Sequence, residues 1–337
     1  MKFFRLEDKI NETKLFAEHG LKDVKQTGLS ILNDYLGLKK GYPLFIAGSP
    51  GSGKTEFTLE ILMNTSILYG WNHFIYCGEG GNIEHIFNEL LHKWLQKPYS
   101  LATEREKLDA EYFISEHFII ANHDNDFTIN EFYDLVLKTE KELNIKFDTT
   151  LFDPFNDIKD ETELFGGRED KYLAHALKQV RISSKKNNRI DILVNHIADV
   201  KAQLDKDSNT RYTPHALASE WAGGRTWQRR GFTMVMIWRP PVFLKDSQGM
   251  PYAKNETHVI IQKAKPKGVS QIGTRSIFYD WKKNRYYCFN GNQQLYSCEK
   301  MEDYLPKSIS ESKIKPNTDF TTSISENDKL FTENEPF

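Results

Sequence analysis

The sequence has few cysteines, almost no net charge and no long apolar run. Its cysteines, Cys77, Cys288 and Cys298, lack metal-ligand spacing, which excludes a disulfide framework and suits a reducing compartment. A formal net charge of −2 excludes a basic nucleic-acid coat, so any contact with a polyanion must come from local Lys and Arg clusters. No run of about 18 apolar residues predicts a membrane span. The charged start is unlike a signal peptide, so we expect a cytoplasmic protein without membrane contact.

The chain divides into three regions of different character. Residues 1–21 alternate apolar and charged side chains, which predicts a short amphipathic helix or arm. The apolar members of this segment are Phe3, Phe4, Leu6, Ile10 and Phe16. This helix packs either on its own domain or on a neighbouring subunit. Residues 22–298 are expected to form one globular domain, and residues 299–337, rich in Ser, Thr, Asn, Glu and Lys, to form a flexible acidic tail.

Short apolar runs alternate with helical stretches through the domain. The runs that predict strands are Pro43–Ala47, His73–Cys77, Phe118–Ala121, Thr149–Phe152 and Ile190–Val194. The stretches that predict helices are Thr55–Leu68, Ile83–Leu95, Ile129–Leu143 and Lys171–Lys185. This alternation predicts an α/β fold whose central sheet is mostly parallel and flanked by helices. A later set with turn residues between its members predicts antiparallel hairpins at the C-terminal edge of the sheet: Phe232–Trp238, His258–Gln262, Ser276–Asp280 and Arg285–Phe289.

One segment matches the phosphate-binding pattern G-x-x-x-x-G-K-[ST] in full. It consists of Gly48, Ser49, Pro50, Gly51, Ser52, Gly53, Lys54 and Thr55. Its glycines let the backbone N–H groups face phosphate oxygens, and the helix that follows adds partial positive charge. In such a P-loop, Lys54 reaches the β- and γ-phosphates and the Thr55 hydroxyl ligates Mg²⁺. The sequence therefore predicts binding of ATP and Mg²⁺, the alternative being a glycine-rich turn without a ligand.

Three polar residues at expected strand ends are candidates to complete this site. Asp153 ends an apolar strand, as in a Walker B motif, where it would hold Mg²⁺ through a water opposite Thr55. Glu79 is a candidate to orient the attacking water. His196 is a candidate to contact the γ-phosphate and report its loss. The alternatives are a turn-capping aspartate, an exposed turn glutamate and a core histidine.

Taken in order, these motifs resemble the RecA-like motor of hexameric replicative helicases, in the group of the T7-phage primase-helicase, Twinkle and DnaB. The matching segments are Thr27-Gly28, Leu32-Asn33-Asp34, Gly41, the P-loop, Tyr76–Glu79, Asp153-Pro154-Phe155-Asn156-Asp157, Asn195-His196, Ile261-Gln262-Lys263-Ala264-Lys265, Ile272-Gly273 and Phe278-Tyr279-Asp280. The resemblance spans residues 22–290 and is of the phage type. No primase-like region fits in the N-terminal segment, so a primase is expected on another chain.

The resemblance implies a ring of six subunits with ATP at each interface, moving on single-stranded DNA and unwinding duplex. It implies that Lys263 and Lys265 stabilise charge on the neighbour's phosphates. Lys265 stands where the family usually has arginine, and lysine cannot make arginine's planar fork. Further candidates for this role are Arg225, Arg229 and Arg230. The alternative is an edge strand blunted by lysines. Tyr279 is similar in position to an aromatic that stacks on the nucleotide base, or else it packs in the core.

Two stretches, residues 158–170 and 199–230, are expected to be irregular loops that line the central hole of the ring. The basic residues expected to contact DNA phosphates are Arg168, Lys201, Lys206, Arg211, Arg225, Arg229 and Arg230. Trp221 and Trp227 are expected to lie against the DNA strand. Surface loops without a ligand are the alternative.

The chain ends in an acidic stretch that closes on Pro336-Phe337, which resembles the tip of bacterial single-stranded-DNA-binding proteins. Such a tip suits a basic-rimmed hydrophobic pocket on a primase, a polymerase or a single-strand-binding protein, and a solvated terminus is the alternative. Two other functions stay open: a RecA- or RadA-like filament ATPase, and an ATP-switched regulator or loader that does not unwind. Frequent Lys, Asn and Ile indicate an AT-rich source, so we expect a bacterial or phage-infected cytosol.

Overall fold

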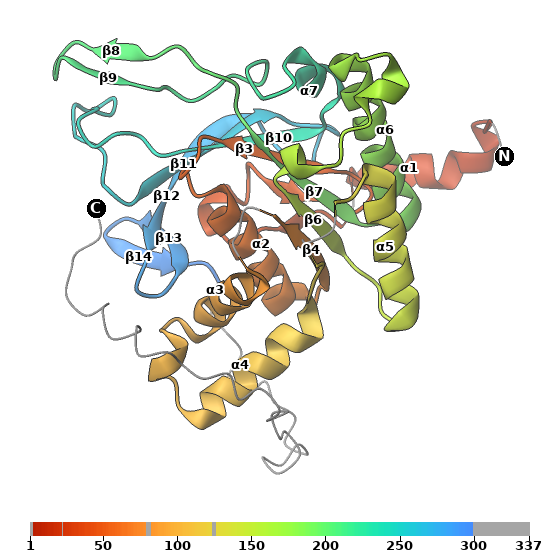
Figure 1. Ribbon diagram of the computed structural model, residues 1–337, viewed down its shortest axis with the longest axis horizontal. Helices are drawn as coiled ribbons and strands as arrows, with labels where there is room; N and C mark the ends of the chain where they lie inside the picture. Colours follow the sequence, from red (N-terminus) through yellow and green to blue (C-terminus); the bar gives the residue numbers. More distant parts are fainter. Residues whose placement is uncertain (1–2, 22, 79–81, 123–125, 299–337) are drawn as a thin grey trace.

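A computed structural model describes residues 3–21, 23–78, 82–122 and 126–298 (Figure 1). Within them, ten strands form one sheet in the order β14-β13-β12-β11-β10-β3-β7-β6-β4-β5. Its strands are β3 (Leu44–Gly48), β4 (His73–Cys77), β5 (Phe118–Ile120), β6 (Thr149–Asp153), β7 (Ile190–His196), β10 (Thr233–Trp238), β11 (Glu256–Lys263), β12 (Gly273–Asp280), β13 (Arg285–Asn290) and β14 (Gln293–Tyr296). Two small sheets pair β1 (Lys25–Gln26) with β2 (Gly37–Leu38) and β8 (Gln203–Asp205) with β9 (Thr210–Tyr212).

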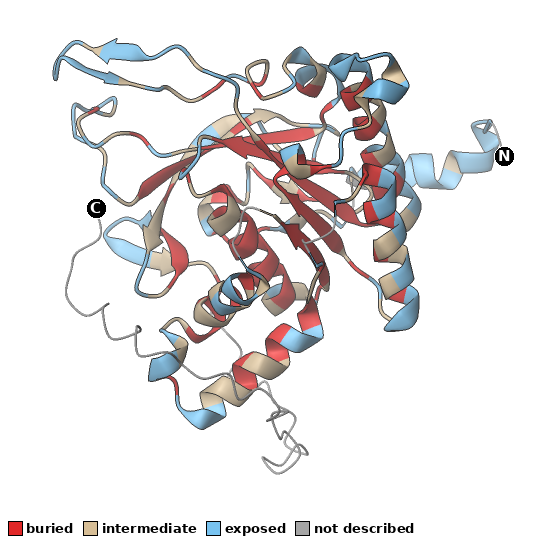
Figure 2. Ribbon diagram, in the orientation of Figure 1, coloured by how far each residue is buried: buried red, intermediate tan, exposed pale blue. Residues whose placement is uncertain are grey.

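Helices cover both faces of the sheet, so its central strands are buried (Figure 2). The helices are α1 (Ile10–His19), α2 (Lys54–Tyr69), α3 (Ile83–Leu95), α4 (Glu104–His117), α5 (Ile129–Glu142), α6 (Glu169–Asn187) and α7 (Arg225–Arg230). Side chains alternate along β3: Leu44 and Ile46 pack with α2, α3 and α4, whereas Phe45 and Ala47 pack with α5, α6 and α7. The expected α/β fold, a mostly parallel sheet between helices, is confirmed.

One expected element was placed wrongly in the sheet. Residues 232–238 were predicted to form an antiparallel hairpin strand, but β10 pairs parallel with β3, with Ile237 opposite Gly48. The chain reaches β10 from β7 through a long crossover that contains α7, and a crossover of this kind returns the chain parallel. Antiparallel pairing starts only on the other side of β10, with β11, and continues through β14.

A helix that the periodicity did not indicate covers the far end of the sheet. Helix α4 starts at a capping box in which the Thr103 side chain accepts from the Glu106 N–H and the Glu106 carboxylate accepts from the Thr103 N–H. The Thr-x-x-Glu spacing was the available signal for this helix. Its apolar face then packs on α3, where the rings of Phe113 and Trp94 stack at 3.7 Å.

The N-terminal helix does not pack on the body of its own chain. Helix α1 projects from the domain (Figure 1), and its segment is pale blue in Figure 2. Phe3, Phe4, Leu6 and Phe16 are 73%, 62%, 64% and 54% exposed. Of the two alternatives for this helix, packing on its own domain is therefore not observed. Among the described residues, no helix combines the length and apolarity that crossing a membrane requires.

Candidate nucleotide site

The P-loop lies at the edge of the sheet where the parallel strands end. All five residues of β3 are buried, and α2 begins directly after the loop, at Lys54. Gly51 and Gly53 have φ angles of 71° and 87°, in the left-handed region that favours glycine. A Cβ at Gly53 would also stand 2.9 Å from the Tyr286 hydroxyl. The loop therefore adopts the tight curl that its glycines predict.

The P-loop lysine and a carboxylate meet at one cavity. Lys54 is 8% exposed, and its Nζ donates to the Ser49 carbonyl at 3.1 Å, so the ammonium lies over its own loop. The cavity has a volume of about 330 Å³. It is lined by Pro50, Gly51, Gly53, Lys54, Thr55, Glu56, Asp153, His196 and Arg239. Four expected site residues, Lys54, Thr55, Asp153 and His196, thus come together from the start of α2 and the ends of β6 and β7.

The oxygens expected to hold Mg²⁺ lie side by side. The Thr55 hydroxyl donates to Asp153 Oδ2 at 2.7 Å, although β6 and β3 are separated in the sheet by β7. Asp153 is 3% exposed. A hydroxyl and a carboxylate are ligands that Mg²⁺ accepts, and both face the phosphate cavity. The donor set therefore fits the ion. Glu79 lies outside the described residues, and the strand before it, β4, ends at Cys77 opposite Asp153.

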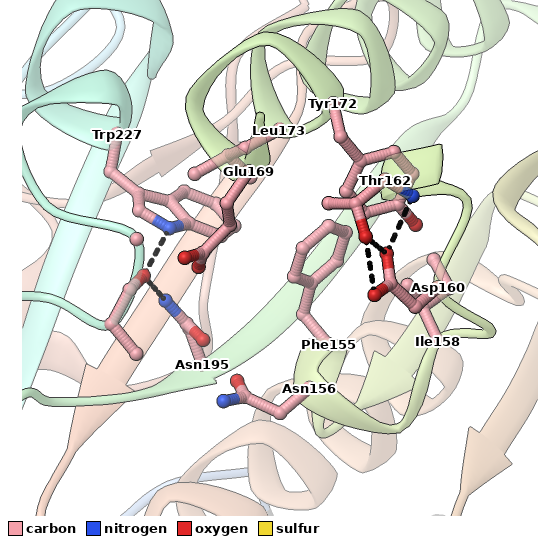
Figure 3. A pocket seen from close by; sticks show the side chains of 12 residues that line it. Phe155, Asn156, Ile158, Asp160, Thr162, Glu169, Tyr172, Leu173, Asn195 and Trp227 are labelled. Atoms are coloured by element: carbon pink, nitrogen blue, oxygen red, sulfur yellow. Dashed lines mark hydrogen bonds between the residues drawn. The ribbon is translucent and has the colours of Figure 1, made fainter. Parts of the chain in front are cut away.

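The end of β7 connects this cavity to the segment before α7. His196 lies opposite Gly48 and lines the phosphate cavity. The adjacent Asn195 points away from it, and its Nδ2 donates to the Ala222 carbonyl at 3.0 Å. The same carbonyl accepts from Trp227 Nε1 at 2.7 Å, as Figure 3 shows. A second cavity of about 240 Å³ lies here, between Asn195, Trp227 and the Walker B loop at Phe155.

Two expectations for the stretch 199–230 are corrected. Trp221 and Trp227 do not lie against a ligand surface, because both are fully buried. Trp227 packs edge-on against Phe45 and Phe155, at 5.3 and 5.2 Å, so its large apolar area stabilises the core. Nor is the stretch irregular: it contains the β8–β9 hairpin, which projects from the domain in Figure 1, and α7.

The basic residues expected to contact DNA fall in three places. Lys201, Lys206 and Arg211 are exposed on or beside the β8–β9 hairpin. Arg225, Arg229 and Arg230 are exposed on α7. Arg168 stands apart before α6 and forms an ion pair with Asp170 at 2.8 Å. The hairpin and α7 therefore present two basic clusters, whereas the charge of Arg168 is partly neutralised within its own loop.

Lys263 lies at the far end of the sheet from its own P-loop. It pairs with Met234 in β10, three residues before Ile237, which pairs with Gly48. Three strand residues span about 10 Å. Lys263 Nζ donates to the Gln228 carbonyl of α7, and burial together with Lys265 lowers the pKa of Lys263. Lys263 therefore faces away from the phosphates of its own chain, as does Lys265, which follows β11.

Arg239 was missed by the sequence interpretation. It directly follows β10, lines the phosphate cavity, and also lines an adjoining cavity of about 550 Å³. Its guanidinium lies 6.0 Å from the ring of Tyr279, which lines the second cavity. A charged residue after the strand beside the P-loop strand was the available signal. It was not used because β10 had been assigned to a hairpin.

Tyr279 both packs in the core and faces this second cavity. Its ring contacts Tyr286 at 5.0 Å, and its hydroxyl donates to Asn284 Oδ1. Burial, and secondarily the nearby Glu56 carboxylate, raises the pKa of Tyr279 well above its usual value, so the hydroxyl stays protonated. A path lined by Arg239 and Tyr279 thus leads from the phosphate cavity to an aromatic cavity.

Comparison with known proteins identifies the fold. No protein-family model matches the sequence, and no curated protein sequence matches it significantly. Among solved structures, the chain is similar to the ATPase domain of a DnaB-like helicase, with a TM-score of 0.67 and 14% identity over 85% of this chain and 99% of that chain. The chain has a RecA-like fold.

A second solved structure supports the same assignment. It is described as a DnaB-like replicative helicase and its interactions with primase, with a TM-score of 0.65 and 14% identity over 84% of this chain and 68% of that chain. The predicted resemblance to DnaB-type helicase motors is thus confirmed at the level of the fold. The RecA-like sheet also explains why Lys54, Asp153 and His196 meet at one edge, since parallel strands end there together.

Proposed function

We propose that this chain is the ATPase motor of a ring-shaped replicative DNA helicase. The observation that carries the proposal is the Thr55–Asp153 contact inside a P-loop cavity that also contains Lys54 and His196. P-loop, Walker B carboxylate and strand-end histidine stand in the order that ATP hydrolysis by RecA-like motors requires. The similarity in fold to the ATPase domain of a DnaB-like helicase supports a helicase motor over other P-loop proteins.

The residues of the cavity divide the work of hydrolysis. Lys54 moves from the Ser49 carbonyl to the β- and γ-phosphates, and the P-loop N–H groups bind the remaining oxygens. Thr55, and Asp153 through a water, hold Mg²⁺, which when bound neutralises negative charge on the phosphates. His196 contacts the γ-phosphate, and Asn195 carries its displacement to Ala222. Glu79 orients the attacking water, which remains a prediction from sequence.

The adjoining aromatic cavity is the proposed place of the nucleotide base. Arg239 lines both cavities, so a ligand with phosphates on the P-loop extends past its guanidinium to Tyr279. A planar base gains from stacking on a tyrosine ring and from a guanidinium plane. The proposed ligand is therefore ATP, with its triphosphate in the first cavity and its adenine in the second.

Assembly into a ring is proposed from groups that lie away from their own phosphate cavity. Lys263 and Lys265 are too far from their own P-loop to contact its phosphates, so they act on the site of a neighbouring copy. The exposed apolar residues of the N-terminal segment, Phe3, Phe4, Leu6 and Phe16, form a surface that we assign to the neighbour as well. A partner at Pro336-Phe337 remains a prediction, because those residues lie outside the described part of the chain.

We expect the hairpin to contribute phosphate contacts that salt weakens. Replacing Lys206 and Arg211 together with alanine should reduce the slope of log affinity against log salt for single-stranded DNA by about 1.4, since each lost phosphate contact contributes about 0.7. Fluorescence anisotropy with an oligonucleotide between low and physiological salt measures this slope. Lys186→Ala, an exposed lysine in the last turn of α6, is the matched control and should leave it unchanged. An unaltered slope in the double variant would remove the hairpin from the DNA site.

Unwinding of a forked duplex tests the proposed function as a whole. ATP hydrolysis should rise with single-stranded DNA, and strand separation should require ATP and Mg²⁺. Negative-stain images of the same sample should show closed rings. Filaments on DNA would favour a recombination ATPase, and DNA-stimulated hydrolysis without strand separation would favour a regulator or loader. Absence of ATP binding by calorimetry would overturn all three.

A further inference from the structure

A fully buried lysine lies beneath the path to the proposed base cavity. Lys93, on α3, has no exposed side-chain surface. Its ammonium donates to the Asn284 carbonyl at 3.0 Å and to Asn284 Oδ1 at 3.1 Å, and lies 3.1 Å from Glu56 Oε2. It also lies 5.7 Å from the centre of the Tyr279 ring. One cation on α3 thus contacts the first turn of the P-loop helix and the turn between β12 and β13.

Asn284 passes this contact on to Tyr279. Its side-chain oxygen accepts from both Lys93 and the Tyr279 hydroxyl. Its Nδ2 donates to Glu89 Oε2 at 2.6 Å, a second residue of α3. Asn284 is 2% exposed and has a φ of 54°, a left-handed conformation that asparagine tolerates. The turn after β12 is therefore clamped to α3, and the Tyr279 hydroxyl is held by the clamp.

Glu56 is the second residue that Lys93 holds. It directly follows Thr55, and it lines the phosphate cavity. Its carboxylate, 28% exposed, lies 3.5 Å from the Tyr279 hydroxyl. Without the ammonium this carboxylate could turn freely toward the cavity. Lys93 therefore bonds to a residue on each side of the route from phosphates to base.

Neutralising buried acid does not by itself explain Lys93. The nearby Glu60 is fully buried, but Arg285 already donates to it at 2.9 Å. Burial alone would raise the pKa of Glu60, and Arg285, with help from Lys93, instead lowers it. Lys93 lies farther from Glu60, at 3.6 Å, than from Glu56 or Asn284. Because a buried ion pair is often no more stable than an apolar replacement, its retention points to a requirement for geometry.

We propose that Lys93 is a positioning residue for nucleotide-base recognition: through Asn284 and Glu56 it sets the ring of Tyr279 beside Arg239. This rests on the proposed ATP site and adds the element that orients its base side. The Tyr279 ring can stack on a base only if its plane is fixed, and its hydroxyl is the atom that the clamp holds. Lys93 does not touch the nucleotide.

The base-dependent part of binding tests this inference. In calorimetry, Lys93→Met should weaken binding of ATP·Mg²⁺ by about tenfold, the size of a lost aromatic contact. Binding of inorganic tripolyphosphate·Mg²⁺, which engages only the P-loop, should stay unchanged. A purely structural role, acting by displacing α2, would weaken both probes equally and would overturn the inference. Lys97→Met is the matched control, because Lys97 pairs with Glu106 at 2.8 Å outside the network and should alter neither affinity.

Tyr279→Phe keeps the test decisive if Lys93→Met does not fold. It retains the ring and removes only the bond to Asn284, so ATP binding should weaken about threefold while tripolyphosphate binding stays the same. Unchanged ATP affinity in this variant would overturn the inference. Wild-type protein that binds tripolyphosphate as tightly as ATP would do so too. Wild-type protein that binds neither probe would overturn the proposed nucleotide site itself.

Discussion

Lys54→Ala is expected to lower ATP hydrolysis by at least about 100-fold at saturating ATP and single-stranded DNA. The ammonium is the cation nearest the phosphates in the P-loop, and removal of one preorganised charge from such a site costs about 2.7–4 kcal/mol of transition-state stabilisation. Steady-state release of inorganic phosphate measures the effect. The fold should survive, because Lys54 donates to a carbonyl of its own loop and belongs to neither hydrophobic cluster of the core.

A lysine elsewhere on the surface provides the control for Lys54. Lys138 on α5 is 71% exposed and forms a loose pair with Glu142 at 3.7 Å. Its replacement with alanine removes the same charge and should leave hydrolysis within about twofold, since exposed pairs contribute little. Equal losses in the two variants would mean that net charge, and not the P-loop cation, controls the rate. Hydrolysis that persists in Lys54→Ala would contradict the nucleotide site.

The paired variant Lys263→Ala/Lys265→Ala is expected to lower hydrolysis by about 100-fold while leaving ATP binding by the isolated subunit unchanged. Both lysines belong to the end of the sheet away from their own P-loop, so the charge they supply reaches only a neighbour's phosphates. Calorimetry on the subunit and phosphate release from the assembly separate binding from turnover.

Mixing this variant with Lys54→Ala tests whether the lysines act between subunits. Each variant alone is inactive, but a subunit with an intact P-loop next to one with intact lysines forms a complete site. Random assortment of equal amounts completes about a quarter of the interfaces, because each requires one subunit of each kind in a fixed order. Hydrolysis should therefore reappear at roughly that fraction of the wild-type rate. A mixture no more active than its components would place the lysines in their own subunit's chemistry or outside the site.

Local sequence was sufficient to predict the elements that carry phosphate chemistry. The glycines of the P-loop, the lysine after them and the buried strand before them are contiguous, so their geometry follows from backbone conformation alone. Asp153 and His196 could be assigned because each ends a strand, and parallel strands of one sheet end at the same edge. The alternation of apolar runs and helices predicted that sheet, and α4 was missed because its signal is a capping pair and not a periodicity.

Pairing across the sheet was beyond the reach of local pattern. Whether β10 joins β3 or stands in a hairpin depends on the path of the crossover before it, and that path decides that Arg239 reaches the phosphate cavity. Trp221 and Trp227 illustrate the same limit, because their surroundings in a polar stretch predicted exposure, whereas the strand end at Asn195 and the aromatic core draw them inside.

The sequence by itself therefore determined the class of fold, the triphosphate loop and the strand-end residues around it, because these depend on neighbours in the chain. Only the tertiary structure decided that Arg239 joins the phosphate cavity, that Lys263 points away from it, and that Lys93 holds Tyr279. Each of these contacts joins residues far apart in sequence, and their meeting depends on strand order and helix packing, which no local pattern encodes.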